Sequence, residues 1–240
     1  MKGSLRTSLF TPTPLPGYYP VMLRAILFDF NGVIVNDEPQ HCDALIAALE
    51  TYGYTLGRPE YYRHYLGFDD RECFRFTFER MGKRADDDLL REAIGRKAEL
   101  YERAIRSSLE LVPGSVDFVR RAAGAGYLLA VVSGALRREI ELILSAADLR
   151  DQFQVIVAAE DVTRCKPDPE GYEAARSALG IPARDCVVIE DSRPGLEAAR
   201  GAGLRCAMIT TSHSAAELGD ADLIWPDLRD RDPAELPWLS

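Results

Sequence analysis

The sequence has few lysines and no tract of basic residues. Its 240 residues carry 29 basic and 38 acidic side chains, which gives a formal net charge of −9. Proteins that bind the phosphate backbone of nucleic acids concentrate lysine and arginine on one segment or face. The composition therefore argues against nucleic acid as a partner, while a hydrophobic content of 47% is ample for a globular core.

Long apolar runs and patterned cysteines are missing as well. No window approaches the roughly 18 to 20 apolar residues that a membrane span requires, so we expect no membrane association. The cysteines number five and show neither a CxxC pair nor a zinc-binding spacing; they are Cys42, Cys73, Cys165, Cys186 and Cys206. This usage is typical of reduced proteins, and we expect a cytoplasmic location without a disulfide framework.

The first 21 residues differ in composition from the rest of the chain. They are rich in proline and threonine and lack the apolar run of a secretory signal. We expect residues 1–21 to form a flexible N-terminal arm. Either the functional chain begins at Met22 or the arm wraps a partner, and the sequence leaves both open.

Short apolar segments recur along the chain with helical patterns between them. Continuous Val, Ile and Leu character without alternation is typical of strands that are buried on both faces, and the intervening helices are long enough for parallel crossovers. The expected strands cover residues 24–28, 127–132, 155–158, 186–189, 205–210 and, more weakly, 221–225. The predicted fold class is α/β, with a doubly wound parallel sheet.

Only helical periodicity remains between the first expected strand and Pro113. Apolar residues recur there on three stripes, formed by Leu45, Ala48, Leu49 and Tyr52, by Phe74, Phe78 and Met81, and by Leu90, Ile94, Tyr101 and Ile105. We therefore expect an all-helical domain over residues 38–111. It would be inserted into a core domain made of residues 22–37 and 112–240.

Polar side chains stand where the expected strands end. In an open parallel sheet, ligands bind beyond the carboxyl ends of the strands. The residues found there are Asp29, Ser133 with Gly134, Lys166 after a loop, and Glu190 with Asp191. Taken singly, each also fits a turn, a helix cap or a solvated strand end. Their joint occurrence in this order favours a functional site.

Each of these residue types has a part in phosphoryl transfer. Asp29 can attack phosphorus and divide a hydrolysis into two displacements. Carboxylates and a backbone carbonyl are the hard oxygen ligands that Mg²⁺ prefers. Lys166, one of only four lysines, adds a compact positive charge. Ser133 and the amides that open the next helix can hold phosphoryl oxygens.

The chain resembles the haloacid dehalogenase superfamily of hydrolases. The resemblance rests on the segments DFNGVIVNDEP, VVSGA, CKPDPEGY and VVIEDSRPGLEAARGAG, and it covers residues 22 to about 225. The similar members carry a helical cap after the first strand, as in the β-phosphoglucomutase and phosphoglycolate phosphatase types. The resemblance implies a Rossmann-like core, a mobile cap and a bound Mg²⁺. It also implies that Asp29 is the nucleophile, that Ser133 and Lys166 bind phosphate, and that Glu190 and Asp191 bind the metal.

Asn31 departs from the family's pattern. Phosphatases that resemble this chain carry an aspartate there, which protonates the leaving group and later activates water. An amide cannot do either, although the main-chain carbonyl of Asn31 can still reach a metal. Residues 36–39 are the expected hinge between the core and the cap. His41, just beyond it, is the first candidate for a substitute, and Asp37 is the second. Each also fits a packing or surface role.

Arg71 lies in the segment that resembles the family's substrate-specificity loop. A guanidinium can reach from a closed cap to a substrate phosphate or carboxylate. In the alternative interpretation, Arg71 is exposed and pairs with Asp70 or Glu72. The sequence does not decide between the two.

The first hypothesis is an Mg²⁺-dependent phosphatase that acts on a small phosphorylated metabolite, as a monomer or weak homodimer. The second hypothesis is a catalytically impaired family member that acts as a regulatory protein or as a binding protein for a phosphorylated ligand. The third is a phosphomutase. The acidic pair Glu190 and Asp191 speaks against a metal-free dehalogenase. A phosphonatase needs a cap lysine as Schiff base, whereas the loop presents Arg71.

Overall fold

A parallel sheet forms the centre of the molecule. The computed structural model describes residues 24–66 and 68–237, so the expected arm over residues 1–21 lies outside the described residues. The sheet has six parallel strands in the order β3-β2-β1-β4-β5-β6. They are β1 (Ala25–Phe28), β2 (Leu128–Val132), β3 (Val155–Val157), β4 (Cys186–Glu190), β5 (Arg205–Ile209) and β6 (Leu223–Trp225). The predicted α/β fold with a doubly wound sheet is confirmed.

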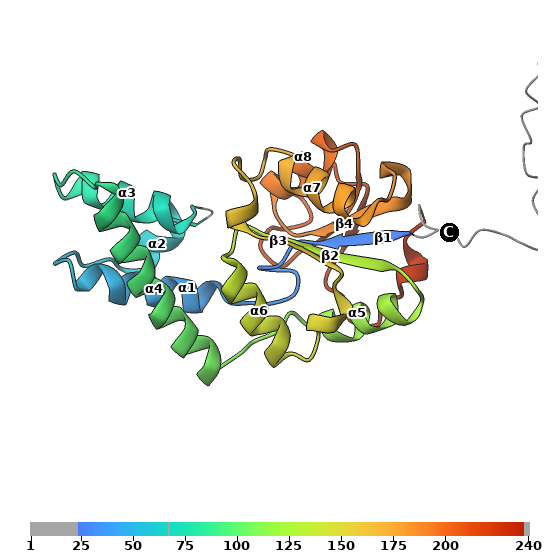
Figure 1. The fold of residues 1–240 in the computed structure, drawn as a ribbon, viewed down its shortest axis with the longest axis horizontal. Helices are drawn as coiled ribbons and strands as arrows, with labels where there is room; N and C mark the ends of the chain where they lie inside the picture. The colour runs from blue at the N-terminus through green and yellow to red at the C-terminus, as the bar shows by residue number, and fades with distance from the viewer. Residues whose placement is uncertain (1–23, 67, 238–240) are drawn as a thin grey trace, which may run out of the picture.

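Helices cover both faces of the sheet (Figure 1). On one face lie α5 (Ser115–Gly124) and α6 (Arg137–Ala146), and on the other lie α7 (Glu170–Leu179) and α8 (Arg193–Gly201). Strand β1 alternates between the two, since Ile26 and Phe28 pack with the first pair of helices while Ala25 and Leu27 pack with the second. Burial on both faces explains why the strands read as unbroken apolar runs.

A helical lobe lies beside the sheet and has its own apolar core. It consists of α1 (Glu38–Glu50), α2 (Arg58–His64), α3 (Asp70–Arg80) and α4 (Asp87–Ser107). The chain enters and leaves the lobe through adjacent segments, because Val35 bridges to Leu111 and the amide of Asn36 donates to the carbonyl of Glu110. That the lobe is a separate domain over residues 38–111 stays a prediction.

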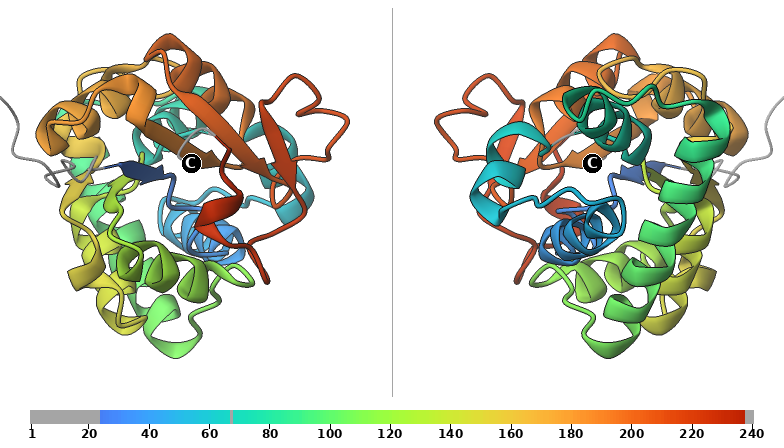
Figure 2. Two further views of the ribbon diagram at one scale, coloured as in Figure 1. Left: turned by 90° about the vertical axis from the view of Figure 1, so that its right-hand side faces the viewer. Right: turned by 90° about the vertical axis from the view of Figure 1, so that its left-hand side faces the viewer.

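The carboxyl ends of the strands face this lobe. Strand β1 begins on the side of the sheet that is away from the helical lobe and runs toward that lobe (Figure 1). Viewed from the lobe, α1 and α4 lie in front of the sheet (Figure 2). The sheet edge that the sequence marks with polar residues therefore faces the helical lobe.

The ends of several elements differ from expectation by a few residues. The sequence pattern predicts a helix over residues 136–149, but α6 ends at Ala146. It also predicts a helix whose first position is Pro169, but α7 begins at Glu170. The sequence predicts Asp168 as the N-cap of this helix, but the N-cap is Pro169. The Asp168 carboxylate still accepts a hydrogen bond from the Glu170 amide at 3.0 Å. Short 3₁₀ turns complete the fold at Arg150–Gln152, Ala159–Asp161, Ala183–Asp185 and Pro233–Glu235. In the described ranges, no helix has the length and hydropathy needed to cross a bilayer.

Phe118 joins α5 to the sheet and tests the packing of this core. It is fully buried and lies edge-on to Phe28 of β1 and Trp225 of β6, with ring centroids 6.1 and 6.0 Å away. Phe118→Ala should lower the free energy of unfolding in urea by about 3–5 kcal/mol, because the cavity can close only in part. The exposed Tyr62 is the control, and Tyr62→Ala should change it by about 0.5 kcal/mol or less. Equal losses in the two variants would contradict this packing.

Candidate active site at the strand ends

Lys166 lies between two carboxylates at the end of the sheet. Its ammonium nitrogen is 2.5 Å from Oδ1 of Asp29 and 2.8 Å from Oε1 of Glu190. The amide of Asp29 donates to the carbonyl of Ile189, which fixes the end of β1 against β4. Burial works against the charge of Lys166, but the two carboxylates outweigh it and raise its pKa. Lys166 therefore stays protonated beside Asp29.

The carboxylate of Glu190 is saturated with protein donors. Oε1 accepts from Lys166 and from the Tyr172 hydroxyl, while Oε2 accepts from the amides of Asp191 and Ser192 and from the Ser192 hydroxyl. Burial raises the pKa of Glu190, yet Lys166 and these hydrogen bonds outweigh it, and the net pKa is lowered. Glu190 thus anchors Lys166 and the turn that follows β4.

Asp29 and Asp191 complete an acidic cluster with Glu190. One oxygen from each of the three lies within 4.8 Å of the others, and all three side chains are buried. Burial raises the pKa of Asp29 to about 7, against the opposing effect of Lys166. Burial and the neighbouring carboxylates raise the pKa of Asp191 to about 8. Oxygens that repel one another in this way fit a hard divalent cation, which would relieve the repulsion.

Two glycines let the carboxylates lie this close to the backbone. A Cβ on Gly32, whose φ is +79°, would lie 1.9 Å from Oδ2 of Asp191. A Cβ on Gly195, in the first turn of α8, would lie 1.6 Å from Oε1 of Glu190. Sequence reasoning did not single out these glycines. Their positions in the sequence could have identified them as sites of close backbone approach. Gly32 comes directly after Asn31 and Gly195 directly after Pro194, and both lie close to an expected strand end.

Asn31 connects the strand ends to the lobe. Its Oδ1 accepts a hydrogen bond from the Ser133 hydroxyl at 3.2 Å, and its Nδ2 lies 2.9 and 3.0 Å from the two carboxylate oxygens of Asp37. Ser133 in turn accepts from the Ala135 amide at 3.0 Å, in the loop that precedes α6. Gly134 lies exposed in the same loop. The structure thus brings Ser133 beside Asn31 at the strand ends.

His41 lies in the lobe and contacts Asp37 rather than the acidic cluster. Its Nε2 is 3.2 Å from Asp37, its Nδ1 is 2.7 Å from the Lys97 ammonium, and its ring stacks on Tyr101 at 4.2 Å. Burial and Lys97 work against charge on His41, but Asp37 and Asp70 outweigh them and raise its pKa. No hydrogen bond joins His41 to Asp29, Asn31 or Ser133 among the described residues.

Arg71 does not reach the strand ends in this conformation. It pairs with Asp87 across the start of α4, and its side chain is half exposed. The alternative that named Asp70 or Glu72 as its partner is wrong, because Asp70 pairs with the buried Lys97 and Glu72 caps α3 with Asp69. Both acids are therefore engaged by partners other than Arg71.

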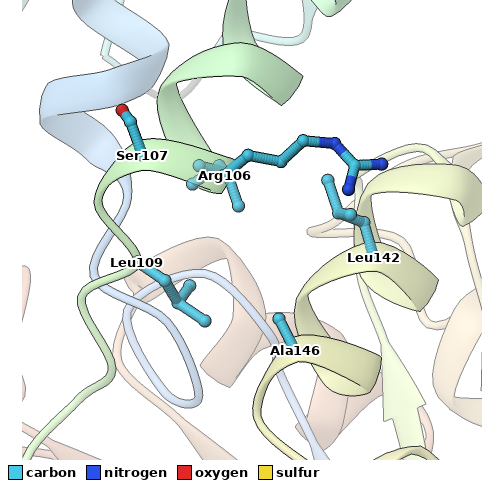
Figure 3. Close-up of a pocket in the computed structure, with 6 residues that line it drawn as sticks. Arg106, Ser107, Leu109, Leu142 and Ala146 are labelled. Carbon is cyan, nitrogen blue, oxygen red and sulfur yellow. The ribbon is translucent and has the colours of Figure 1, made fainter.

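The loop after β5 supplies two contacts that sequence reasoning missed. The Ser212 hydroxyl donates to Oδ2 of Asp191, and Nδ1 of His213 lies 3.1 Å from the main-chain oxygen of Asp191. This loop follows the carboxyl end of β5. The rule that ligands bind beyond the carboxyl ends of parallel strands therefore applies to it as well. A pocket lined by Ile105, Arg106, Ser107, Leu109, Leu142 and Ala146 lies elsewhere, between the end of α4 and α6, and holds no carboxylate (Figure 3).

The close approach of Gly195 to Glu190 is directly testable. Gly195→Ala should lower the free energy of unfolding by about 2–4 kcal/mol, because the methyl group displaces a buried carboxylate that holds Lys166. Gly124→Ala is the matched control. Gly124 lies at the exposed end of α5 with open space around it, so alanine should be neutral or stabilising. Equal stability of the two variants in urea unfolding would refute the contact.

Comparison with known proteins places this geometry in a family. Residues 26–209 match the haloacid dehalogenase-like hydrolase family. Validoxylamine A 7′-phosphate phosphatase of Streptomyces hygroscopicus subsp. limoneus is 30% identical over 215 residues, which cover 86% of this chain and 95% of that protein. The phosphorylated carbohydrates phosphatase of Thermotoga maritima is 30% identical over 184 residues, covering 76% and 82%.

A solved structure agrees with the sequence comparison. CbbY from Rhodobacter sphaeroides in complex with phosphate superposes with a TM-score of 0.80 at 29% identity, over 90% of this chain and 100% of that one. A mutant of the same protein is known in complex with xylulose 1,5-bisphosphate. Because the family match spans residues 26–209 and the relatives cover most of the chain, the chain belongs to the haloacid dehalogenase-like hydrolases, a family that includes phosphatases.

Proposed function

We propose that the protein is an Mg²⁺-dependent phosphatase of a small phosphorylated metabolite and works through an aspartyl phosphate on Asp29. The observation that carries this proposal is the position of Lys166, 2.5 Å from Asp29 and 2.8 Å from Glu190. A lysine held there by a saturated carboxylate offsets the charge of the nucleophile and of an incoming phosphoryl group. The phosphatases among the relatives support the same reaction class.

Asp29 would act as nucleophile. One of its carboxylate oxygens bonds to phosphorus while the bond between phosphorus and the leaving oxygen breaks, and the leaving group takes that electron pair. Water then attacks phosphorus, and the Asp29 carboxylate departs in its original form. Lys166 holds positive charge beside both displacements because its own proton is stabilised by two carboxylates.

The carboxylates of Asp29 and Asp191 and the main-chain carbonyl of Asn31 would hold Mg²⁺. When bound, the ion would offset the negative charge of the carboxylates and the phosphoryl group. Glu190 was expected as a direct ligand. With both oxygens taken by protein donors, it would act through its charge and through its grip on Lys166.

Phosphate binding and cap closure complete the proposal. The amides of the Gly134 loop would hold phosphoryl oxygens, and the Ser133 hydroxyl would join them by turning its hydrogen from Asn31 to the phosphoryl group. The loop leads into the N-terminus of α6. The helical lobe would close on the strand ends as a cap and exclude water. Arg71 would contact the substrate only after leaving Asp87.

A second candidate function follows from Asn31. Its amide is held by Asp37 and cannot carry a proton, which favours a protein that binds a phosphorylated ligand with slow turnover. Turnover measured with Asn31→Asp separates the two candidates. A large gain on every substrate, starting from an inert native protein, would favour the binding protein.

Phosphate release tests the proposed function. With Mg²⁺ and a panel of sugar, nucleotide and acyl phosphates, the native protein should release phosphate from at least one substrate. Asp29→Asn should lower kcat by about 10³-fold or more, because no covalent intermediate can form. Asp88→Asn, at a side chain 88% exposed in the lobe, should leave kcat unchanged. Undiminished activity in Asp29→Asn would contradict the assignment of the nucleophile.

Binding of Mg²⁺ should depend on pH. Protons and the cation compete for the same oxygens, and the metal-free protein has pKa values of about 7 at Asp29 and about 8 at Asp191. Both groups are protonated below these values, so the affinity for Mg²⁺ should rise from about pH 6 to about pH 9, with release of protons near pH 7. Calorimetry in buffers of different ionisation enthalpy measures both. A flat affinity, or unchanged binding in Asp191→Asn, would contradict the site.

A further inference from the structure

The side chain of Asn31 is held in one orientation. A carboxylate can only accept hydrogen bonds, so the group that faces both oxygens of Asp37 at 2.9 and 3.0 Å must be the NH₂ of Asn31. Oδ1 consequently points toward Ser133, whose hydroxyl donates to it at 3.2 Å. Asn31 therefore presents a hydrogen-bond acceptor, and no proton, toward the phosphate-binding loop.

Asp37 cannot replace the missing acid. Only 1% of its surface is exposed, and it accepts hydrogen bonds from Asn31, from the Tyr101 hydroxyl and from His41. These donors leave its oxygens committed to protein partners and stabilise the ionised form. Asp37 acts as an anchor for the Asn31 amide.

His41 is equally committed. Nε2 faces Asp37 and Nδ1 faces the Lys97 ammonium, so both ring nitrogens have protein partners. Its connection to the strand ends runs through Asp37 to Asn31, where an amide cannot pass a proton on. On the core side, Glu139 of α6 is 4% exposed, and one of its oxygens has no hydrogen-bond partner while the other accepts from the Leu136 amide. Burial raises the pKa of Glu139 against the charges of His41 and Lys97, so its electrostatic partners belong to the lobe.

The other groups next to the nucleophile are also engaged. Lys166 is shared by Asp29 and Glu190, the Ser133 hydroxyl hydrogen goes to Asn31, and Asp191 belongs to the proposed metal site. Among the described residues, the side chains that form hydrogen bonds with those of Asp29 or Asn31 are Lys166, Asp37 and Ser133, and each is held by protein partners. His213 lies behind Asp191, where its Nδ1 contacts the main-chain oxygen. This arrangement fits a leaving group that needs no proton.

We propose that the substrate is an anhydride of phosphoric acid rather than an alkyl phosphate. The anhydride is either an acyl phosphate or a compound in which two phosphates share an oxygen. This inference rests on the proposed function. Asp29 bonds to phosphorus, the bond from phosphorus to the bridging oxygen breaks, and a carboxylate or phosphate departs as a stable anion with that electron pair. Water then attacks the aspartyl phosphate, which regenerates the Asp29 carboxylate and yields inorganic phosphate, with the remaining proton of water passing to solvent.

The size of the expected preference follows from the missing acid. A positioned acid contributes about 10²- to 10⁴-fold when an alkoxide must leave, and little when the departing anion is already stable. Acetyl phosphate and glycerol phosphate differ mainly in this respect. The ratio of kcat/KM for acetyl phosphate to kcat/KM for glycerol phosphate should therefore be about 10²- to 10⁴-fold larger in the native protein than in Asn31→Asp, where an acid is supplied.

The experiment measures kcat/KM for acetyl phosphate, glycerol phosphate and a series of aryl phosphates with graded leaving-group basicity. Native protein, Asn31→Asp and Asp29→Asn are compared with Mg²⁺ present, and Asp29→Asn gives the uncatalysed background. We expect a steep fall of the native kcat/KM with leaving-group basicity. Asn31→Asp should flatten this dependence and raise kcat/KM for glycerol phosphate by about 10²- to 10⁴-fold. The kcat/KM for acetyl phosphate, which reports the first displacement and not the attack of water, should change by less than about tenfold.

The outcomes separate the inference from the proposed function. If the native protein hydrolyses glycerol phosphate as well as acetyl phosphate, and Asn31→Asp changes neither, the anhydride preference is wrong while the phosphatase stands. If neither the native protein nor Asn31→Asp releases phosphate from any substrate above the Asp29→Asn background, the proposed function fails and the inference falls with it. A folded state for each variant is checked by its urea unfolding curve.

Discussion

One buried lysine among carboxylates determines the arrangement of the strand ends. Removing a charge from water costs on the order of several kcal/mol per ion unless a partner and hydrogen bonds offset it. Here Lys166 serves Asp29 and Glu190 together, and Glu190 accepts three further hydrogen bonds from the turn after β4. The backbone has to approach these carboxylates closely. That requirement accounts for glycine at positions 32 and 195.

The parallel sheet makes this cluster possible. Because β1 and β4 are neighbours and run in the same direction, their carboxyl ends deliver Asp29 and Glu190 to one place, although the residues lie far apart in sequence. The helical lobe faces the same edge, and the Asn31, Asp37 and His41 contacts link it to the strand ends. The hydrogen bonds from the charged groups of the lobe lead through Asp37 to the amide of Asn31. Because an amide cannot pass a proton on, these groups cannot exchange protons with the nucleophile by this route.

The strands, the order of the site residues and the family could be predicted from the sequence. Buried parallel strands appear as unbroken apolar runs, and polar residues such as Asp29 and Asp191 stand directly after their ends, while Lys166 follows β3 after a loop. Position along the chain was enough because a parallel sheet places all carboxyl ends on one edge. The weaker segment near residue 221 was the least regular, and only Leu223–Trp225 forms a strand.

The side-chain partners could not be predicted in the same way. The pairing of Arg71 with Asp87, of Lys97 with Asp70 and His41, and of Ser212 with Asp191 depends on how helices and loops pack in three dimensions. Sequence periodicity gives the buried face of a helix but not the neighbour across from it. Glu190 shows the same limit, since its position in the sequence gives no sign of the protein donors that engage both of its oxygens.

The central claim is that Asp29 becomes covalently phosphorylated. Rapid quenching of the native protein with Mg²⁺ and acetyl phosphate, followed by mass spectrometry of the peptide that contains residue 29, tests it most directly. The account predicts a phosphoryl group on Asp29 that forms and decays at rates compatible with phosphate release. Phosphate release without any phosphorylated Asp29 peptide, or with full activity in Asp29→Asn, would contradict it.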